Sequence, residues 1–348
     1  MDPAAVSSFQ THLAASSRIV AIIGAGLSAP SGLSTFRSTN GLWNKHDVFL
    51  IASPAGWRRD PGLVWKFYSG RRRDALAAKP NPAHFALANL ARHKQGFVAL
   101  SQNVDGLLQR AGLNAGTQLK LLHGNLFDLA CAGGCGYVEE GNTDDPLCPA
   151  LSLSATTEEK EKKVLGADIA EEEKPPRASA LLFAGIAAKN KKILGDEKFV
   201  PPELTRRDAA PLKELGEEER LPDTIPALHS GISKEELPLC PGCEGKNLLR
   251  PSVVWFGEAL PEDVMSDVDA LFAEEKIDLC LVIGTSSKVW PTAGFAEQAR
   301  NRGARVAWVN TEMEAVKNKR RDDWVFLGDA GTVLPEILGV YGTDKLGE

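Results

Sequence analysis

Short apolar runs, each followed by a polar loop, recur along the chain and predict the buried strands of a parallel sheet. The first run, residues 19–23, reads Ile-Val-Ala-Ile-Ile and ends at Gly24. Similar runs occupy residues 97–100, 279–283 and 306–309. Short runs rich in β-branched and aliphatic residues are typical of strands that are covered on both faces.

Helix-like segments between these runs complete an α/β pattern. Residues 261–275 and 293–302 are the clearest of them. Strands that alternate with helices favour a doubly wound parallel sheet, the Rossmann-like class. Ligands bind such sheets outside the carboxyl ends of the strands, where the polar loops would meet. The loops in question are residues 24–29, 101–105, 284–286 and 310–312.

The composition changes between residues 149 and 238. Charged runs stand at residues 158–163, 171–174 and 217–220. The segment holds two Phe and neither Trp nor Tyr, which leaves little with which to build a core. It is therefore predicted to be a charged, partly disordered insertion that has no chemistry of its own.

Length and charge narrow the possible functions. The 348 residues suggest one large domain with a smaller companion. With 40 basic and 46 acidic residues the net charge is −6, which disfavours binding to a nucleic-acid backbone. No stretch approaches the roughly 18 apolar residues of a membrane span. The N-terminus has no apolar signal core and only Arg18 as a basic residue, so it resembles a transit peptide poorly.

Two close pairs of cysteines predict a metal site. Cys131 and Cys135 form the first pair, and Cys240 and Cys243 form the second. Four thiolates bind one Zn²⁺ tetrahedrally and fill its coordination sphere, so the ion would be structural. Cys148, which precedes a proline, is an alternative ligand, and reduced buried cysteines without a metal are the other alternative.

A glycine-rich loop follows the first predicted strand. Residues 24–29, Gly-Ala-Gly-Leu-Ser-Ala, fit the G-x-G-x-x-A pattern. Glycines let the backbone approach a pyrophosphate, and a following helix offers free N–H donors. A tight turn without a ligand fits equally well, and hydride-transferring dehydrogenases use such a loop too. The long polar continuation at residues 31–37 argues against a dehydrogenase.

Together these motifs resemble those of the sirtuins, which are NAD-dependent protein lysine deacylases. The resemblance covers about residues 18–148 and 240–340. It implies a Rossmann-like NAD-binding domain with a small zinc-binding domain. The motifs that carry it are residues 24–28, Ser31-Gly32, Phe36-Arg37, residues 102–105, His123-Gly124, the two cysteine pairs, residues 254–258 and residues 284–286.

The resemblance also implies the residues that bind the cofactor NAD and those that perform the reaction. His123 would be the catalytic base, since an imidazole has an ordinary pKa near 6.5, and Asn103 would act beside it. Amides and a carboxylate suit ribose hydroxyls and a carboxamide, although an Asx-rich turn is the alternative for residues 102–105. The expected NAD contacts are Gly24, Ala25, Gly26, Ser28, Phe36, Arg37, Trp43, Gln102, Asn103, Asp105, Gly284, Thr285, Ser286, Asn310, Thr311, Glu312 and Ala330.

Tyr68 and Arg71 suggest which acyl group is removed. In a helix these two positions share one face. The Tyr-x-x-Arg pattern resembles the class III sirtuins, which remove succinyl, malonyl and glutaryl groups. A guanidinium binds a carboxylate through two hydrogen bonds, and a phenol adds a third. Ala52 resembles the small residue that widens this pocket, and a solvated basic face at residues 71–73 is the alternative.

Two further loops resemble the edges between which an acylated peptide pairs as a strand. The loop at residues 287–291 would form one edge. Backbone pairing carries little sequence information, so a loose peptide preference is expected. The residues of the other edge are Val254, Trp255, Phe256, Gly257 and Glu258.

The leading hypothesis is an NAD-dependent lysine deacylase for acidic acyl groups that releases nicotinamide and O-acyl-ADP-ribose. Its partners would be NAD and acylated lysine side chains of proteins, with one structural zinc ion. A deacetylase of the same fold and an NAD-sensing binding module are the alternatives. Mitochondrion, cytoplasm and nucleus are all compatible with the sequence. The expected domains are residues 1–120 with 245–348 (NAD-binding), residues 121–148 with 239–244 (zinc-binding) and residues 149–238 (insertion).

Overall fold

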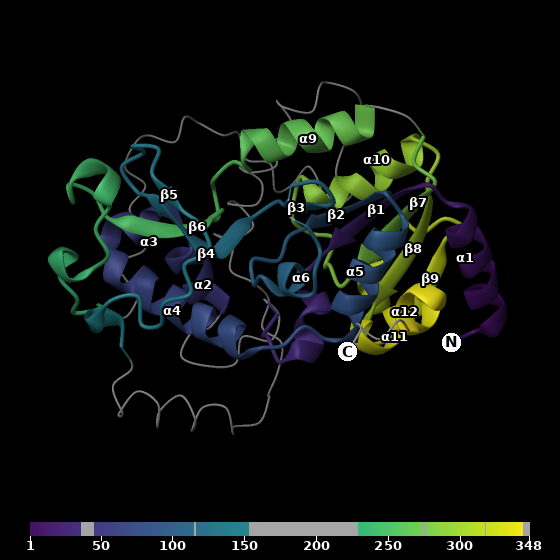
Figure 1. Ribbon diagram of the computed structural model, residues 1–348, viewed down its shortest axis with the longest axis horizontal. Coiled ribbons are helices and arrows are strands. Elements are labelled where there is room, and N and C mark those ends of the chain that lie inside the picture. Colours follow the sequence, from purple (N-terminus) through teal and green to yellow (C-terminus); the bar gives the residue numbers. More distant parts are fainter. Residues whose placement is uncertain (36–44, 115, 153–228, 274–275, 317, 344–348) are drawn as a thin grey trace, which may run out of the picture.

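The molecule has two lobes, a larger one built on a parallel sheet and a smaller one built on an antiparallel sheet (Figure 1). The coordinates are a computed structural model. The structure describes residues 1–35, 45–114, 116–152, 229–273, 276–316 and 318–343. Both chain ends that it describes lie on the larger lobe.

The larger lobe is organised by a six-stranded sheet with the order β3-β2-β1-β7-β8-β9. All five pairings are parallel, and the order reverses on either side of β1. This confirms the Rossmann-like class and the four predicted strands, which are β1, β2, β7 and β8. The short edge strands β3 and β9 were not predicted. The bounds are β1 Arg18–Ile23, β2 Gly96–Ser101, β3 Leu119–Leu121, β7 Leu279–Ile283, β8 Arg305–Asn310 and β9 Trp324–Leu327.

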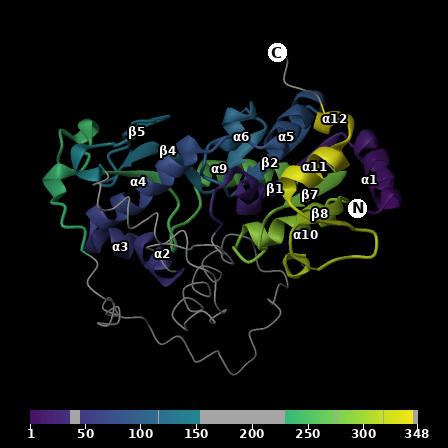
Figure 2. The same cartoon turned by 90° about the horizontal axis from the view of Figure 1, so that it is seen from below.

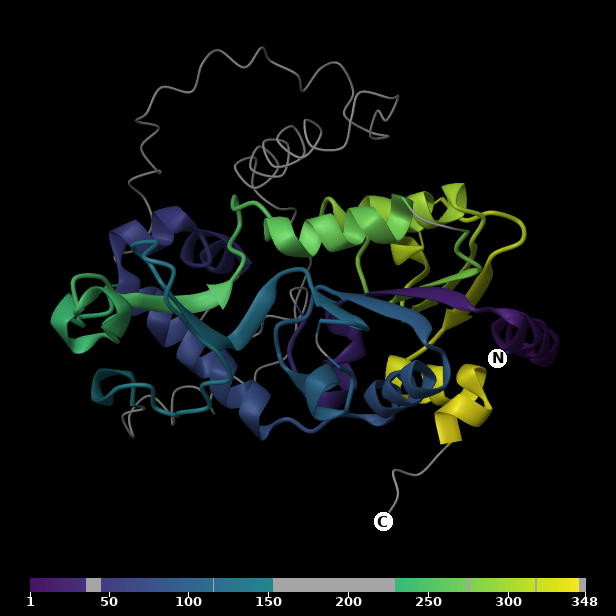
Figure 3. The same cartoon turned by 45° about the horizontal axis from the view of Figure 1, so that its top comes forward.

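Alternate residues of β1 face opposite layers of helices, as the two-residue period of a strand requires. Ile19, Ala21 and Ile23 pack with α1, α5 and α11. Val20 and Ile22 pack with α9 and α10 on the other face (Figures 1 and 3). The predicted helices at 261–275 and 293–302 are confirmed as α9 and α10, with shorter bounds. The bounds are α1 Pro3–Ala15, α5 Pro82–His93, α6 Leu107–Arg110, α9 Glu262–Ala273, α10 Phe295–Asn301, α11 Ala330–Leu338 and α12 Val340–Thr343.

The chain directly after β1 differs from the expected strand-to-helix turn. It makes two short 3₁₀ turns, Ala25–Leu27 and Ala29–Ser31, instead of an α-helix. The second turn ends at Gly32, whose φ of 86° is left-handed and breaks any continuing helix. No α-helix N-terminus therefore follows this loop in the residues that the structure describes, and the expectation of one was wrong.

The smaller lobe joins three parts of the chain (Figure 2). Its antiparallel sheet has the order β5-β4-β6, and its helices are α2, α3 and α4. β6 pairs with β4, although the sequence placed residues 245–348 with the NAD-binding domain. Trp65 on α4 and Phe127 on β4 belong to its core. The bounds are α2 Lys45–Ile51, α3 Pro54–Arg59, α4 Pro61–Ala77, β4 Gly124–Cys131, β5 Val138–Glu139 and β6 Leu249–Val253.

Both ends of the predicted insertion are anchored in the smaller lobe. Leu151 near its start and Leu237 near its end are 4% and 3% exposed and belong to the same core. Residues 153–228, where the prediction of partial disorder falls, lie outside the described residues. Short 3₁₀ turns mark the two ends, at Pro149–Leu151 and Lys234–Glu236.

The chain that returns from the insertion is fastened to the N-terminus of α4. Asp60 caps this helix by accepting from the backbone N–H of Leu63 at 2.8 Å. The same carboxylate accepts from the hydroxyl and the backbone N–H of Ser230 at 2.6 and 2.8 Å. Lys66 Nζ donates to the Ser230 carbonyl at 2.7 Å. A Cβ at Gly62 would lie 2.4 Å from Ser230 Oγ, so only glycine permits this close approach.

None of the described helices is both long and apolar enough to cross a membrane. The longest helix in the described part of the chain is α4, with 17 residues. It carries Lys66, three consecutive arginines and Asp74.

Removing the hydroxyl of Ser230 should destabilise the smaller lobe. In Ser230→Ala the buried Asp60 carboxylate loses its shortest hydrogen bond, so the free energy of unfolding should fall by about 1–3 kcal/mol. Urea unfolding measures this change. Ser266→Ala, on the exposed side of α9, is the control and should shift stability by less than about 0.5 kcal/mol. Equal stability of the two variants would show that the contact contributes nothing.

Candidate active site and metal centre

Polar loops that follow four strands of the larger sheet meet at its carboxyl edge, as the sequence predicts. Gln102, after β2, donates from Nε2 to Thr285 Oγ1 at 3.1 Å. Asn310, at the end of β8, donates from Nδ2 to the Thr285 carbonyl at 2.9 Å. The backbone N–H of Gly26, after β1, donates to the Gly284 carbonyl at 2.8 Å. The loops after β1, β2, β7 and β8 are thus joined directly to one another.

The glycines of the first loop are needed because two backbones touch. A Cβ at Gly26 would lie 2.6 Å from the Gly284 Cα, and one at Gly24 would lie 2.7 Å from the Thr285 Cα. Gly284 itself has a left-handed φ of 58°. The sequence attributes these glycines to close approach of a ligand, and the structure shows that they also allow close approach of the loop after β7.

Ser28 is the centre of a buried hydrogen-bond network. Its hydroxyl donates to Asp105 Oδ2 at 2.7 Å and accepts from Asn103 Nδ2 at 3.1 Å. Burial raises the pKa of Asp105, and hydrogen bonds from Ser28 and the Leu107 backbone N–H oppose that rise. Three predicted site residues, Ser28, Asn103 and Asp105, are therefore brought together by loops that are 75 to 77 residues apart in the sequence.

His84 is a fourth member of this network, and the sequence analysis missed it. Its Nδ1 accepts from the backbone N–H of Asn81 at 3.2 Å, so the proton of the neutral ring lies on Nε2. Nε2 faces the Ser28 hydroxyl at 3.4 Å. The ring is 0% exposed, and burial lowers its pKa to about 4. The sequence signal that could have revealed His84 is the spacing Asn81-Pro-Ala-His84. It is the spacing of a capping box, in which Asn81 caps the helix and the side chain three residues later binds the Asn81 backbone N–H.

His123 presents one ring nitrogen to the site. Its Nδ1 lies 3.0 Å from the Gln102 carbonyl, which only accepts, so Nδ1 carries the proton of the neutral ring. Nε2 is then the unprotonated nitrogen. Burial lowers the pKa of His123, while the Gln102 carbonyl raises it in part, so the ring is neutral at pH 7. The His123 carbonyl accepts from the Val254 N–H at 2.9 Å and links the ring to the loop after β6.

The structure describes some of the remaining predicted NAD contacts but not others. Ser286 follows Thr285 in the joined loops, and Ala330 is the first residue of α11, 5% exposed. Thr311 and Glu312 are exposed just after β8. The predicted contacts Phe36, Arg37 and Trp43 lie outside the described residues.

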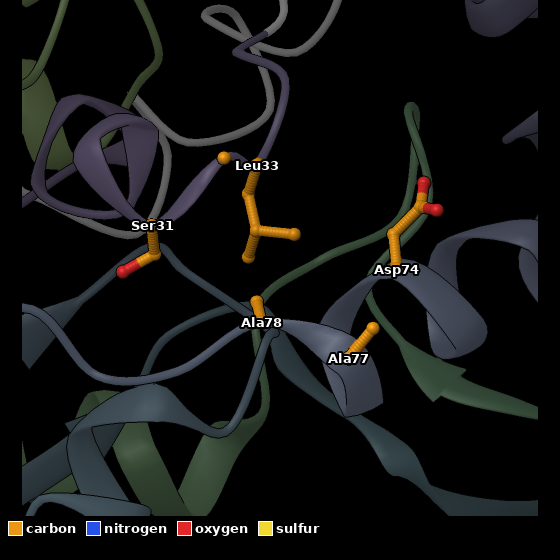
Figure 4. Close-up of a pocket in the computed structure, with 6 residues that line it drawn as sticks. Ser31, Leu33, Asp74, Ala77 and Ala78 are labelled. Carbon is orange, nitrogen blue, oxygen red and sulfur yellow. The ribbon is translucent and has the colours of Figure 1, made fainter.

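A cavity of about 280 Å³ lies between the glycine-rich loop and the C-terminal part of α4 (Figure 4). Ser31 and Leu33 line it from the loop, and Asp74 and Ala77 line it from α4. Neither Tyr68 nor Arg71 is among its lining residues. The cavity therefore lies beside the network of Ser28 rather than at the predicted acyl pocket.

The three consecutive arginines of α4 have three different environments, so they do not form one solvated basic face. Arg72 is 1% exposed and donates to the carbonyl of Leu126 at 2.7 Å, which ties α4 to β4. Arg73 pairs with Asp145 near the surface at 3.0 Å. Arg71 is half-buried above the Phe67 ring, and among the described residues it pairs with no carboxylate. Burial lowers the pKa of the Arg71 guanidinium.

Tyr68 lies beside Arg71, as their spacing on one helix predicts. Its side chain is 7% exposed, and burial raises its pKa well above the ordinary value of 10. The positive charges of Arg250 and Arg71 act in the opposite direction. Ala52, the predicted small residue, is 5% exposed and belongs to the same core, and its carbonyl accepts from the Phe256 N–H at 2.9 Å.

Arg250 was not predicted, yet it organises the loop after β6. Its two terminal nitrogens donate to the two Glu258 carboxylate oxygens at 2.6 and 2.8 Å. Glu258 also accepts from the Trp255 backbone N–H at 2.8 Å. The Arg250 guanidinium stacks on the Trp255 indole, with its Cζ 3.4 Å from the ring centre. This interaction holds most of the predicted substrate loop, which also contains Val254, Phe256 and Gly257, in one conformation.

The two cysteine pairs converge on one point in the smaller lobe. Their Sγ atoms all lie within 4.8 Å of one another. The Cys131–Cys243 and Cys135–Cys240 sulfur distances are 3.9 and 3.6 Å. Four sulfurs around a tetrahedral Zn²⁺ are about 3.8 Å apart, given a Zn–S bond of about 2.3 Å. The quartet fits one zinc ion.

Cys148 is not part of this cluster in the described residues, so the alternative with Cys148 as a ligand was wrong. Asn247 Nδ2 donates to Cys243 Sγ at 3.3 Å, a contact to the ligand atom that is typical of structural metal sites.

A parallel Rossmann-like sheet with a four-cysteine lobe at its side defines a class of α/β proteins that bind a dinucleotide and a structural metal. The sequence matches the model of the Sir2 family over residues 24–157 and 221–291. The chain belongs to the Sir2 family, which confirms the resemblance to sirtuins.

Relatives agree with this assignment over nearly the whole chain. A protein of Candida albicans named NAD-dependent protein deacylase is 37% identical over 336 residues, which cover 95% of each chain. A protein of Danio rerio named NAD-dependent protein deacylase sirtuin-5, mitochondrial, is 34% identical and covers 96% of this chain and 86% of its own. A solved structure described as a Sir2 homolog–NAD complex has a TM-score of 0.61 at 27% identity, covering 95% and 92% of the two chains.

Loss of one predicted zinc ligand should release the metal. We expect one zinc per chain in the wild type and in Cys148→Ser, but almost none in Cys243→Ser, as measured by elemental analysis. The thermal midpoint of Cys243→Ser should fall by roughly 5–10 °C, because a bound structural metal stabilises the folded state. Zinc loss in Cys148→Ser with retention in Cys243→Ser would contradict the quartet.

Burial of neutral His84 should make the protein sensitive to acid. The pKa of about 4 in the folded state lies below the ordinary 6.5, so this contribution to stability is complete above pH 6.5 and is lost as the pH falls toward 4. His84→Asn should therefore lose less stability over this range than the wild type, by up to about 3 kcal/mol. Urea unfolding at a series of pH values measures the difference. His93→Asn, exposed at the end of α5, should retain the wild-type pH dependence.

Proposed function

We propose that this protein is an NAD-dependent protein-lysine deacylase that removes acidic acyl groups, namely succinyl, malonyl and glutaryl. Arg71 carries this proposal, because it is a half-buried guanidinium beside Tyr68 that forms no ion pair in the described residues, where the Asp74 carboxylate acts on it only through its charge. The names of the fungal and zebrafish relatives, both NAD-dependent protein deacylases, support the general reaction. The zebrafish relative's name sirtuin-5 agrees with the acidic-acyl class to which Tyr-x-x-Arg points.

The joined loops at the carboxyl edge suit NAD by the chemistry of their donors and acceptors. The amides of Gln102, Asn103 and Asn310 and the hydroxyls of Ser28 and Thr285 match sugar hydroxyls and a carboxamide. NAD, when bound, supplies an electrophilic ribose carbon from which nicotinamide departs. Asn103 is oriented for this role, because its backbone N–H binds Ser101 Oγ and its side chain binds Ser28.

His123 is proposed as the catalytic base. The Gln102 carbonyl fixes the proton on Nδ1, which leaves Nε2 as the atom that accepts a proton. Because burial lowers the pKa of His123, the ring is in its basic form throughout the neutral range. The four-cysteine zinc site has its coordination filled by sulfur and holds the smaller lobe together without entering the reaction.

Arg71 and Tyr68 would bind the carboxylate at the end of the acyl chain. A guanidinium donates two parallel hydrogen bonds to a carboxylate, and the phenol donates one more. Burial has already taken these donors partly out of water without giving them a carboxylate partner, so an anionic acyl group would gain a charge-assisted interaction. An acetyl group offers no carboxylate and gains nothing from these donors.

The proposed partners are NAD and acylated lysine side chains of proteins, with the loop at residues 254–258 as one edge for the peptide. The zebrafish relative's name places that protein in mitochondria, which supports this compartment among the three that the sequence allows. The absence of a nucleic-acid or membrane partner remains a prediction from charge and composition.

Arg71→Met tests the acyl specificity. It should lower kcat/KM for a succinyl-lysine peptide roughly 10- to 100-fold, mainly by raising KM, and change deacetylation less than about threefold. Paired succinyl- and acetyl-lysine peptides with saturating NAD measure both activities. Arg73→Met is the matched control, because Arg73 pairs with Asp145 at the surface and should affect neither activity.

The same assay separates the alternatives. Equal losses on both peptides in Arg71→Met, or a wild type that removes acetyl but no succinyl groups, would favour an ordinary deacetylase. A wild type that binds NAD without releasing nicotinamide on any acyl peptide would favour an NAD-sensing module instead.

A further inference from the structure

The indole N–H of Trp255 is a buried donor without an acceptor. Trp255 is 2% exposed, and its Nε1 is one of three buried side-chain polar atoms of the described residues that lack a hydrogen bond. An unsatisfied buried donor costs about 1–3 kcal/mol, and folded proteins retain few of them. Such a donor next to a predicted binding pocket calls for a functional explanation.

The ring of Trp255 is packed chiefly against Arg250. Arg250 stacks on one face with its Cζ 3.4 Å from the ring centre, and Trp57 packs nearby with a centroid distance of 5.4 Å. Glu258 accepts from the Trp255 backbone N–H and from both terminal nitrogens of Arg250. The indole therefore cannot rotate to find another acceptor without losing its stacking on Arg250.

The acceptor that could bind the indole N–H is the hydroxyl oxygen of Tyr68. Both residues belong to the core of the smaller lobe. The indole N–H lowers the pKa of Tyr68, although burial dominates and raises it overall. In the structure the indole N–H and the Tyr68 oxygen do not form a hydrogen bond of normal geometry, because Trp255 Nε1 has no partner in the described part of the chain.

Tyr68 also lacks an acceptor for its own proton. The neighbours that act on it electrostatically are Arg71 and Arg250, which only donate, and Glu258, whose carboxylate oxygens already accept from Arg250 and the Trp255 backbone N–H. If the phenol oxygen accepts from the indole, its O–H must point away from Trp255. No hydrogen bond of the Tyr68 O–H to any described residue is present, so none of these residues competes with a bound ligand for this proton. A carboxylate is an acceptor of the right charge for a pocket that also holds Arg71.

We propose that Trp255 is a positioning residue for acyl specificity: its indole N–H donates to the Tyr68 hydroxyl oxygen and directs the Tyr68 proton to the carboxylate of the bound acyl group. This inference rests on the proposed removal of acidic acyl groups. An N–H donated to a phenol oxygen also strengthens the O–H as a donor. Arg250 and Glu258 contribute indirectly, because they fix the position of the indole.

The proposal predicts that the effect of Trp255 passes through Tyr68 alone. Trp255→Phe keeps an aromatic ring and removes the N–H. Its kcat/KM should fall about tenfold more for a succinyl-lysine peptide than for an acetyl-lysine peptide, mainly through KM. In a Tyr68→Phe background, Trp255→Phe should cause no further loss on the succinyl peptide. Trp57→Phe, which truncates the stacked neighbour in the same way, is the matched control and should leave the acyl preference unchanged.

The double-mutant cycle decides between specific and general effects. Equal losses on both peptides, or losses from Trp255→Phe and Tyr68→Phe that simply multiply, would overturn the role of Trp255 while leaving the acidic-acyl function intact. A wild type that does not remove succinyl, malonyl or glutaryl groups would overturn the proposed function, and this inference with it. A thermal midpoint for each variant, measured with NAD present, shows that the compared proteins are folded.

Discussion

Contact between two backbones is the constraint on which the site depends. The loop after β1 and the loop after β7 approach so closely that a Cβ at Gly26 would lie 2.6 Å from the Gly284 Cα. With these loops in contact, Thr285 reaches Gln102, and Ser28 reaches Asn103 and Asp105. The Gln102 carbonyl then sets the tautomer of His123. The parallel sheet brings the strand ends together, and the glycines allow the loops to join.

Contacts within the smaller lobe hold α4 in a fixed position. Its N-terminus is fastened by Asp60 and Ser230, and Arg72 at its centre binds the Leu126 carbonyl on β4. These contacts involve charged groups with little exposure to water, where each hydrogen bond contributes more than at the surface. Tyr68 and Arg71 lie on the same helix, so the contacts that anchor α4 also position the proposed acyl pocket.

Buried polar groups in this protein fall into two kinds. Arg72 and His84 are satisfied by carbonyl and backbone partners, and they stabilise the fold at neutral pH. Arg71 and the Trp255 indole lack such partners among the described residues, and both lie beside Tyr68. These two donors lie beside the hydroxyl that is proposed to bind the carboxylate, and Thr292 Oγ1 and Arg300 Nε are the other buried side-chain atoms of the described residues that lack a hydrogen bond.

Local sequence determined the four central strands, the convergence of their loops, the cysteine quartet and the shared helix face of Tyr68 and Arg71, because each depends on short-range period or spacing. Only the tertiary structure decided the fates of Arg71, Arg72 and Arg73, which differ although the residues are identical and adjacent. It also decided the roles of His84 and Arg250, whose partners stand on other elements or in a turn. Burial and unpaired donors arise from packing between distant segments, and no pattern along a single segment encodes them.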